Sequence, residues 1–147
     1  MAEPLTLERL QRYLDNSPFI AFMRMRAKAV EPEKETVVLE MPMRPEFERG
    51  KGTGQWHGGP LAAIIDTVGD YALIMLLRRG LPTINFRVDY LRPAIKTGLV
   101  ITAKVRRAGK SVGVSMSTCS TSRRRCWRWG GRLIRHCRGD VRPPLHR

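Results

Sequence analysis

One long apolar segment, residues 58–78, constrains the fold more than any other feature of the sequence. Its apolar residues recur at intervals of three and four, the period of a helix with one buried face. They are Leu61, Ile64, Ile65, Val68, Ala72 and Met75. Pro60 suits the first turn of a helix, and two arginines followed by Gly80 suit its end. We therefore expect one central helix at about residues 58–78.

Shorter segments on both sides of this helix alternate apolar and polar side chains, which is the period of a half-buried β-strand. The expected strands lie within residues 19–30, 36–43, 83–91 and 99–107, and a further strand begins at 111–115. A short amphipathic helix is expected at residues 5–14, with Thr6 as its N-cap. One long helix against five or six strands predicts an α+β fold.

The chain has two different compositions. Its 147 residues suggest one domain with a net charge of +14, but residues 116–147 hold nine arginines and a single acidic residue. All three cysteines, Cys119, Cys126 and Cys137, also lie in that segment. Their spacing matches no zinc motif, and three thiols cannot all pair within one chain, so we expect no metal and no cofactor. The domain is therefore predicted to span residues 1–115 and to be followed by an Arg/Cys/Trp-rich tail at 116–147.

Charge and hydropathy limit the classes of partner. Because more than half of the net charge lies in the tail and no base-reading motif accompanies it, we expect no nucleic-acid partner. The longest strongly apolar run, Tyr71 to Leu77, is far shorter than a membrane span. The first ten residues lack the basic start and apolar block of a signal peptide. These features predict a cytoplasmic protein without a membrane partner.

The stretch GQWHGGPLAAIID, residues 54–66, places a histidine and two glycines directly before the helix and a carboxylate inside it. Glycines at a helix N-terminus can expose backbone N–H groups to an anionic ligand. Asp66 lies seven residues after Gly59, two full turns, so both point to one side of the helix. Small residues lie near that side: Ala62, Ala63 and Gly69. A carboxylate on a close-packing face is costly unless it has a function. The alternative is a simple helix start with a surface carboxylate.

Three segments resemble hotdog-fold acyl-CoA thioesterases of the subgroup related to the phenylacetate-pathway enzyme. They are WHGGPLAAIIDTVGDYA, PTINFRVDYLRPA and VRRAGKSVGV, and the resemblance covers roughly residues 15–115. It implies a long helix wrapped by an antiparallel sheet. It also implies a homodimer or a dimer of dimers that hydrolyses acyl-CoA thioesters without metal or cofactor. A hotdog domain that binds acyl-CoA or an effector without turnover is the alternative.

The resemblance also implies roles for individual residues. The N–H of Gly59 would donate to the thioester oxygen as negative charge develops there. Asp66 would be the general base or the nucleophile. His57 would orient the loop or the substrate. Three further residues are assigned to substrate or water binding: Gly58, Gln55 and Thr83.

Five cations on the body either form a solvated face or attract the phosphates of CoA: Arg87, Arg92, Lys96, Arg106 and Arg107.

Helix geometry predicts that the site is shared between two chains. Gly59 and Asp66 are about 10 Å apart along the helix axis, from seven steps of about 1.5 Å. A single thioester carbon cannot touch both within one chain. Two antiparallel helices about a two-fold axis would bring Gly59 of one protomer to Asp66 of its partner. We therefore expect two shared active sites per dimer.

The tail lacks the final hairpin that the family requires after KSVGV. A second reading frame joins the third base of each codon to the first two bases of the next. In that frame Met116 to Cys119 read polar, apolar, polar, apolar, and Cys126, Trp127 and Trp129 become apolar. We interpret residues 116–147 as a frameshifted last hairpin, and we expect a frayed sheet edge there. The alternative is a genuine Arg-rich tail that binds nucleic acid or membranes.

Overall fold

A computed structural model describes residues 3–122 and the backbone of residues 129–136. Its helices are α1 (Leu7–Asn16), α2 (Pro18–Met23) and α3 (Gly58–Leu77), with short 3-10 turns at Pro32–Lys34 and Pro45–Phe47. Its strands are β1 (Arg26–Glu31), β2 (Thr36–Met41), β3 (Thr83–Asp89), β4 (Leu99–Ala108), β5 (Val112–Thr121) and β6 (Trp129–His136).

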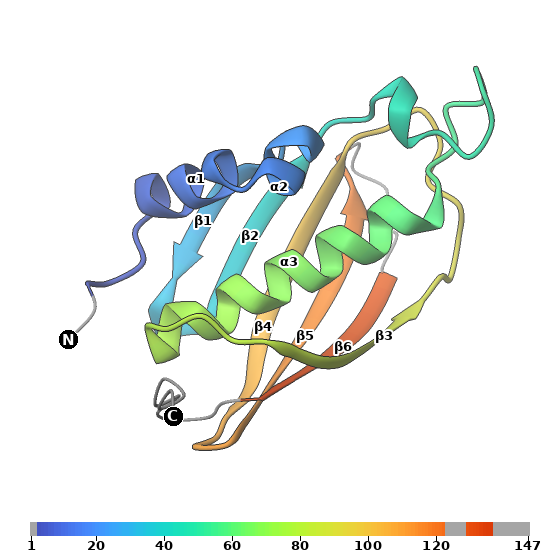
Figure 1. Cartoon of the computed structure of the whole chain (residues 1–147). Coiled ribbons are helices and arrows are strands. Elements are labelled where there is room, and N and C mark those ends of the chain that lie inside the picture. The colour runs from blue at the N-terminus through green and yellow to red at the C-terminus, as the bar shows by residue number, and fades with distance from the viewer. Residues whose placement is uncertain (1–2, 123–128, 137–147) are drawn as a thin grey trace, which may run out of the picture.

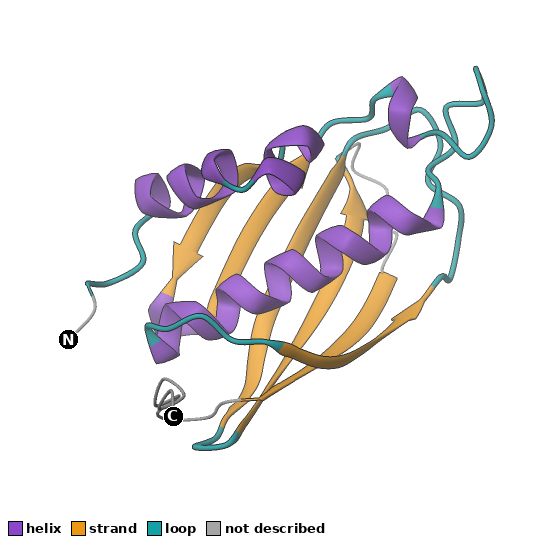
Figure 2. Ribbon diagram, in the orientation of Figure 1, coloured by secondary structure: helices purple, strands orange, loops and turns teal. Residues whose placement is uncertain are grey.

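The strands form one six-stranded antiparallel sheet in the order β1-β2-β4-β5-β6-β3, and α3 lies across one face of it (Figures 1 and 2). The helix packs mainly on β4 and β5, while α1 packs on β1. The expected α+β architecture is therefore confirmed. It leaves β3 at one edge of the sheet, beside the outer face of α3.

The central helix forms as its apolar stripe predicts. Ile64, Val68 and Leu73 are fully buried against the sheet. The helix ends at Leu77 because Arg78 adopts the left-handed conformation, with φ of 54°, and donates its N–H to the carbonyl of Ile74. Among the described helices, α3 is also long and apolar enough to cross a membrane by composition alone. Because most of it is buried inside this domain, it is the core helix of the fold.

The segment before β1 differs from the sequence prediction. Residues 19–23 were expected to begin a strand, but they form α2, with Pro18 in its first turn. Alternation over so few residues fits one helical turn as well as a strand. Met23 is buried, whereas Phe19 and Phe22 are exposed, and Arg24 ends the helix in the left-handed region. The first helix was predicted well, since Thr6 caps α1 by accepting the N–H of Arg9 at 3.2 Å.

The sheet continues past the predicted domain boundary at residue 115. Strand β5 continues to Thr121, and its small inward side chains, Ser115, Ser117 and Cys119, are buried. Serines on the inner face hid the alternation in the sequence. The backbone of β6 pairs with both β5 and β3, which contradicts the expected frayed edge. Two of the three cysteines lie outside the described residues.

Candidate active site

The loop that precedes α3 is fixed by hydrogen bonds to two other segments. The indole N–H of Trp56 donates to the carbonyl of Thr97 at 2.9 Å, and its backbone N–H donates to Ala94 at 3.0 Å. The backbone N–H of His57 donates to the carbonyl of Phe47 at 2.8 Å. The rings of Phe47 and Trp56 also stack, with centroids 5.7 Å apart. The loop therefore holds the start of α3 in one position.

His57 is the N-cap of α3. Its Nδ1 accepts the N–H of Gly59 at 3.0 Å, so the imidazole carries its proton on Nε2 in this arrangement. The Gly59 N–H is therefore already engaged, which argues against its predicted role as the ready donor to a thioester oxygen. Within residues 3–122, the Gly58 N–H has no hydrogen-bond acceptor. The Gly58 carbonyl accepts the hydroxyl of Tyr90 at 2.9 Å.

Asp66 and Thr83 are brought together from α3 and the start of β3. The Thr83 hydroxyl donates to Oδ1 of Asp66 at 2.9 Å. Asp66 is half-buried, on the side of α3 that faces away from the sheet. The ladder between β3 and β6 shifts register between Thr83 and Asn85. This shift lets Thr83 and Phe86, three residues apart, both reach the surroundings of Asp66.

Two pockets divide the predicted site residues. The helix-end pocket, of about 730 Å³, lies at the N-terminus of α3. It is lined by Arg49, Gln55, Trp56, His57, Gly58, Gly59, Leu61, Tyr90, Leu91, Arg92, Pro93 and Ala94. The Asp66 pocket, of about 440 Å³, lies farther along the helix. It is lined by Ser17, Phe19, Ile20, Ala63, Asp66, Thr67, Asp70, Tyr71 and Phe86. Within one chain, Gly59 and Asp66 therefore line different pockets.

The small-residue face was only partly predicted. Ala62 and Ala63 are half-buried on α3, and Ala63 lines the Asp66 pocket. Gly69, by contrast, is buried against the sheet, where its carbonyl accepts the hydroxyl of Ser115 at 3.1 Å. Gly69 therefore lets β5 pack closely against the inner side of the helix, and it is not part of the outer face.

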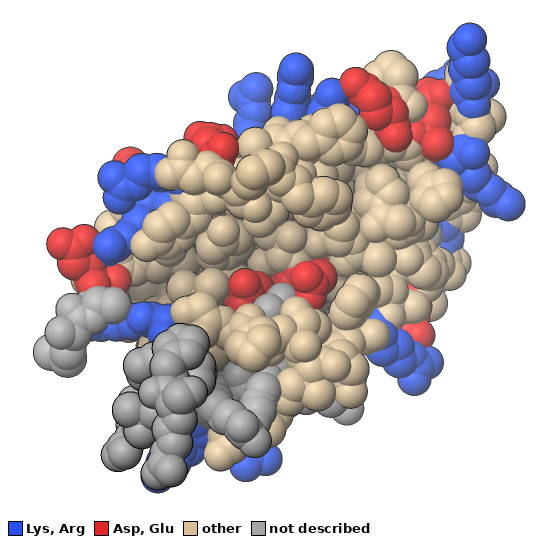
Figure 3. All heavy atoms as spheres, in the orientation of Figure 1, with Lys and Arg blue, Asp and Glu red and all other residues tan. Residues whose placement is uncertain are grey.

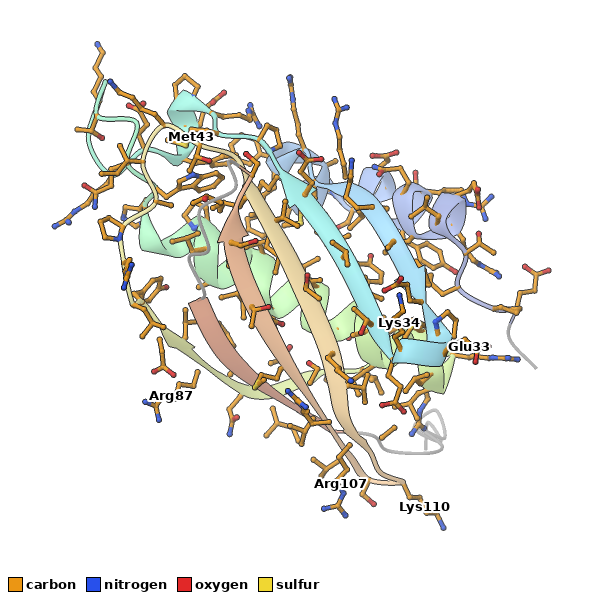
Figure 4. The ribbon with its side chains drawn as sticks, turned by 180° about the vertical axis from the view of Figure 1, so that it is seen from behind. Glu33, Lys34, Met43, Arg87, Arg107 and Lys110 are labelled. Carbon is orange, nitrogen blue, oxygen red and sulfur yellow. The ribbon has the colours of Figure 1, made fainter. Side chains whose placement is uncertain are left out.

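The basic residues of the body do not form one patch. Arg92 lines the helix-end pocket together with Arg49, which was not among the predicted residues. Arg87 pairs with Asp89 at 2.8 Å and is exposed. In Figure 4, Arg87 points outward from β3, while Arg107 points outward near the turn between β4 and β5. A solvated face therefore describes most of these cations, and Arg92 is the one beside the predicted site.

The outer face of α3 is locally acidic. Figure 3 shows acidic side chains together in the middle of this face and Lys and Arg at its periphery. Asp66 and Asp70 are the charged residues in the described lining of the Asp66 pocket. Burial, and then the charge of Asp70, raise the pKa of Tyr71 to about 12. Asp70 was not among the predicted site residues, although its spacing of four residues from Asp66 places both on one helical face.

Comparisons with known proteins agree with this geometry. The sequence model of the thioesterase superfamily matches residues 53–115. A Halobacterium salinarum protein named "Putative esterase" is 32% identical over 111 residues, covering 72% of each chain. The chain belongs to the thioesterase superfamily. Acyl-coenzyme A thioesterase 13 of Mus musculus is 33% identical over 89 residues, which cover 54% of this chain and 63% of that protein.

A solved structure confirms the hotdog fold of this thioesterase-superfamily enzyme. The E. coli PaaI protein from the phenylacetic acid degradation operon superimposes with a TM-score of 0.74 at 21% identity. The match covers 91% of this chain and 97% of that chain. At this identity the likeness establishes the fold.

Proposed function

We propose that this thioesterase-superfamily protein hydrolyses acyl-CoA thioesters, with aromatic or short to medium acyl chains, to the free acid and CoA. The observation that carries the proposal is the hydrogen bond from Thr83 to Asp66, a carboxylate that lines a pocket on the outer face of α3. Helix and strand hold this carboxylate in place before any substrate arrives. Such preorganisation is what general-base or nucleophilic catalysis requires.

As a general base, Asp66 takes a proton from water while the water oxygen attacks the thioester carbon. The carbon–sulfur bond then breaks, and CoA leaves as the thiol after accepting that proton. As a nucleophile, Asp66 would instead attack the thioester carbon and form an anhydride as the carbon–sulfur bond breaks and CoA leaves as the thiolate. Water would then hydrolyse the anhydride to the free acid and the Asp66 carboxylate, and the proton released from that water would pass to the CoA thiolate. In both routes negative charge develops on the thioester oxygen, which a helix N-terminus stabilises.

The donor to that oxygen is the N–H of Gly58 in this proposal. The Gly59 N–H donates to His57 and becomes available only if the imidazole turns away. His57 thus orients the helix start and leaves Gly58 as the first open donor. Gln55 lines the same pocket, and its backbone carbonyl accepts the N–H of Arg49 at 2.7 Å.

A homodimer, or a dimer of dimers, completes the site in this proposal. The edge strand β3 presents two large apolar side chains, Ile84 and Phe86, that are 49% and 42% exposed. Long apolar sheet edges are unfavourable in a monomer and pair readily with a second copy. A two-fold axis beside α3 brings the helix-end pocket of one protomer to the Asp66 pocket of its partner. Arg49 and Arg92 then face the CoA moiety, while the aromatic pocket takes the acyl group.

A kinetic screen tests the proposal. Phenylacetyl-, benzoyl- and medium-chain acyl-CoA should be hydrolysed by the wild-type protein. Asp66→Asn should lower kcat by about 10²- to 10⁴-fold, because the amide keeps the shape but cannot take a proton. Asp15→Asn, on the surface of α1, is the matched control, and His57→Ala should lose less than Asp66→Asn.

Two results contradict specific parts of the proposal. If Asp66→Asn keeps more than about a tenth of the wild-type kcat, Asp66 is not the base or nucleophile. If the acyl-CoAs bind and none is hydrolysed, the protein is a binding domain, the alternative from the sequence. The cytoplasmic location and the lack of nucleic-acid or membrane partners stay predictions from the sequence.

A further inference from the structure

The two pockets differ in chemistry, and this difference assigns the ends of a thioester substrate. The helix-end pocket holds two arginines and the N-terminus of α3, which suit the phosphates and amides of CoA. The Asp66 pocket holds aromatic and aliphatic side chains, namely Phe19, Ile20 and Phe86, which suit an acyl group. The acyl group therefore extends from the reacting carbon into the pocket that also contains Asp70.

Asp70 lies one turn beyond Asp66 on α3. Four residues at about 1.5 Å each place it about 6 Å farther along the helix axis. It lines the same pocket, and its charge contributes to the raised pKa of Tyr71 on the pocket wall. An acyl group whose carbonyl carbon meets Asp66 would bring its fourth to sixth atoms to Asp70.

We infer that Asp70 determines acyl specificity, by accepting a hydrogen bond from a hydroxyl or amino group about 6 Å beyond the thioester carbonyl. This inference rests on the proposed function. Partial removal of a carboxylate from water is costly, and a charge-assisted hydrogen bond from the substrate offsets that cost. A purely hydrocarbon acyl group would desolvate Asp70 without donating a hydrogen bond to it.

The same geometry disfavours acyl groups that end in a carboxylate. Such a group would come to rest against Asp70 and near Asp66, two charges of its own sign in a partly buried pocket. The pocket thus distinguishes three acyl groups of equal length. They are hexanoyl, 5-hydroxypentanoyl, in which a hydroxyl replaces the terminal methyl, and glutaryl, in which a carboxylate ends the chain.

The test measures kcat/KM for these three CoA thioesters. The wild-type protein should favour 5-hydroxypentanoyl-CoA over hexanoyl-CoA by about tenfold, the effect of one hydrogen bond to a charged group. Glutaryl-CoA should be the poorest of the three. Asp70→Leu should prefer hexanoyl-CoA, and Asp70→Asn, which still offers an amide oxygen, should reduce the preference without reversing it. Glu33→Gln removes one charge from an exposed 3-10 turn and should leave the ratios unchanged.

The binding of two thioethers, S-hexyl-CoA and S-(5-hydroxypentyl)-CoA, is measured in parallel because it needs no turnover. If no thioester is hydrolysed but the hydroxylated thioether binds more tightly through Asp70, the inference stands and the proposed function fails. Hydrolysis with a hydroxyl preference that both Asp70 variants retain would overturn the inference alone. So would a wild-type protein that prefers hexanoyl-CoA.

Discussion

At the residue scale, the hydroxyl of Thr83 helps to orient Asp66. Thr83→Val keeps the shape of the side chain but removes the donor to Oδ1 of Asp66. Since a hydrogen bond to a charged group contributes about 1.5–3 kcal/mol, kcat should fall about tenfold or more, with KM little changed. Thr83→Ser restores the hydroxyl and should recover most of the rate. Full activity in Thr83→Val would show that the contact is only structural.

The residues of the site could be predicted from sequence only in part. Asp66 was identified from its spacing to Gly59 and Thr83 through the family resemblance, and the structure joins them although they are 17 positions apart. The engagement of Gly59 by His57 could not be foreseen, because side-chain capping depends on a rotamer that no spacing reveals. Asp70 was overlooked because the resemblance assigns it no role, although helical periodicity alone placed it beside Asp66.

At the scale of elements, the proposed dimer depends on β3. Ile84→Glu places a charge on the apolar strand edge and should convert the proposed dimer to a monomer, because like charges would meet across the two-fold axis. Activity should fall in parallel, since each monomer would hold only half of a site. Light scattering coupled to gel filtration, together with kcat, measures both effects.

The matched control is Leu7→Glu, which places the same charge on an exposed position of α1 away from β3. It should change neither mass nor activity. A monomeric Ile84→Glu variant with full kcat would show that one chain holds a complete site.

Helices and strands with a long hydrophobic pattern in the sequence were predicted more accurately than those with a short one. The stripe in α3 spans about four turns. The predicted end of the helix at residue 78 lies one residue past Leu77, the end in the structure. The alternation before β1 covers too few residues to distinguish α2 from a strand. Strand β5 was cut short because serines occupy its buried positions, where the pattern requires apolar residues.

At the scale of the whole molecule, stability should fall at alkaline pH. Burial raises the pKa of Cys119 from 9.0 to about 12. Between those values the unfolded chain loses the thiol proton while the folded chain keeps it, so the free energy of unfolding decreases as pH rises. Tyr71 acts in the same direction from 10.0 to about 12. Urea midpoints from about pH 8 to about pH 11 should fall. They should fall less steeply in Cys119→Ala, and an equal slope would contradict the assignment.

The unusual composition of the tail also has a consequence for the core. Ser117 on β5 has a buried hydroxyl with no hydrogen-bond partner among the described residues. A buried, unsatisfied polar group costs about 1–3 kcal/mol. Ser117→Val should therefore raise the urea midpoint. Ser120→Val on the same strand should not, because it removes a hydrogen bond to the carbonyl of Val100.

The second reading frame predicts apolar residues at the buried positions of β5. If one lost base is restored upstream, the new codon 119 consists of the third base of the present codon 118 and the first two bases of the present codon 119. The middle base of this new codon is always U, so the residue at position 119 is apolar. The codon at position 117 becomes Val if the Ser117 codon begins with UC. Both positions are buried in the strand as it stands. The second frame thus places apolar residues at the positions of β5 whose side chains face the core, as the pattern of a half-buried strand requires.

Resequencing the gene across codons 112–130 should reveal a missing or additional base, and the reframed protein should unfold at higher urea. An unchanged gene sequence would make the Arg-rich tail genuine and would overturn this interpretation.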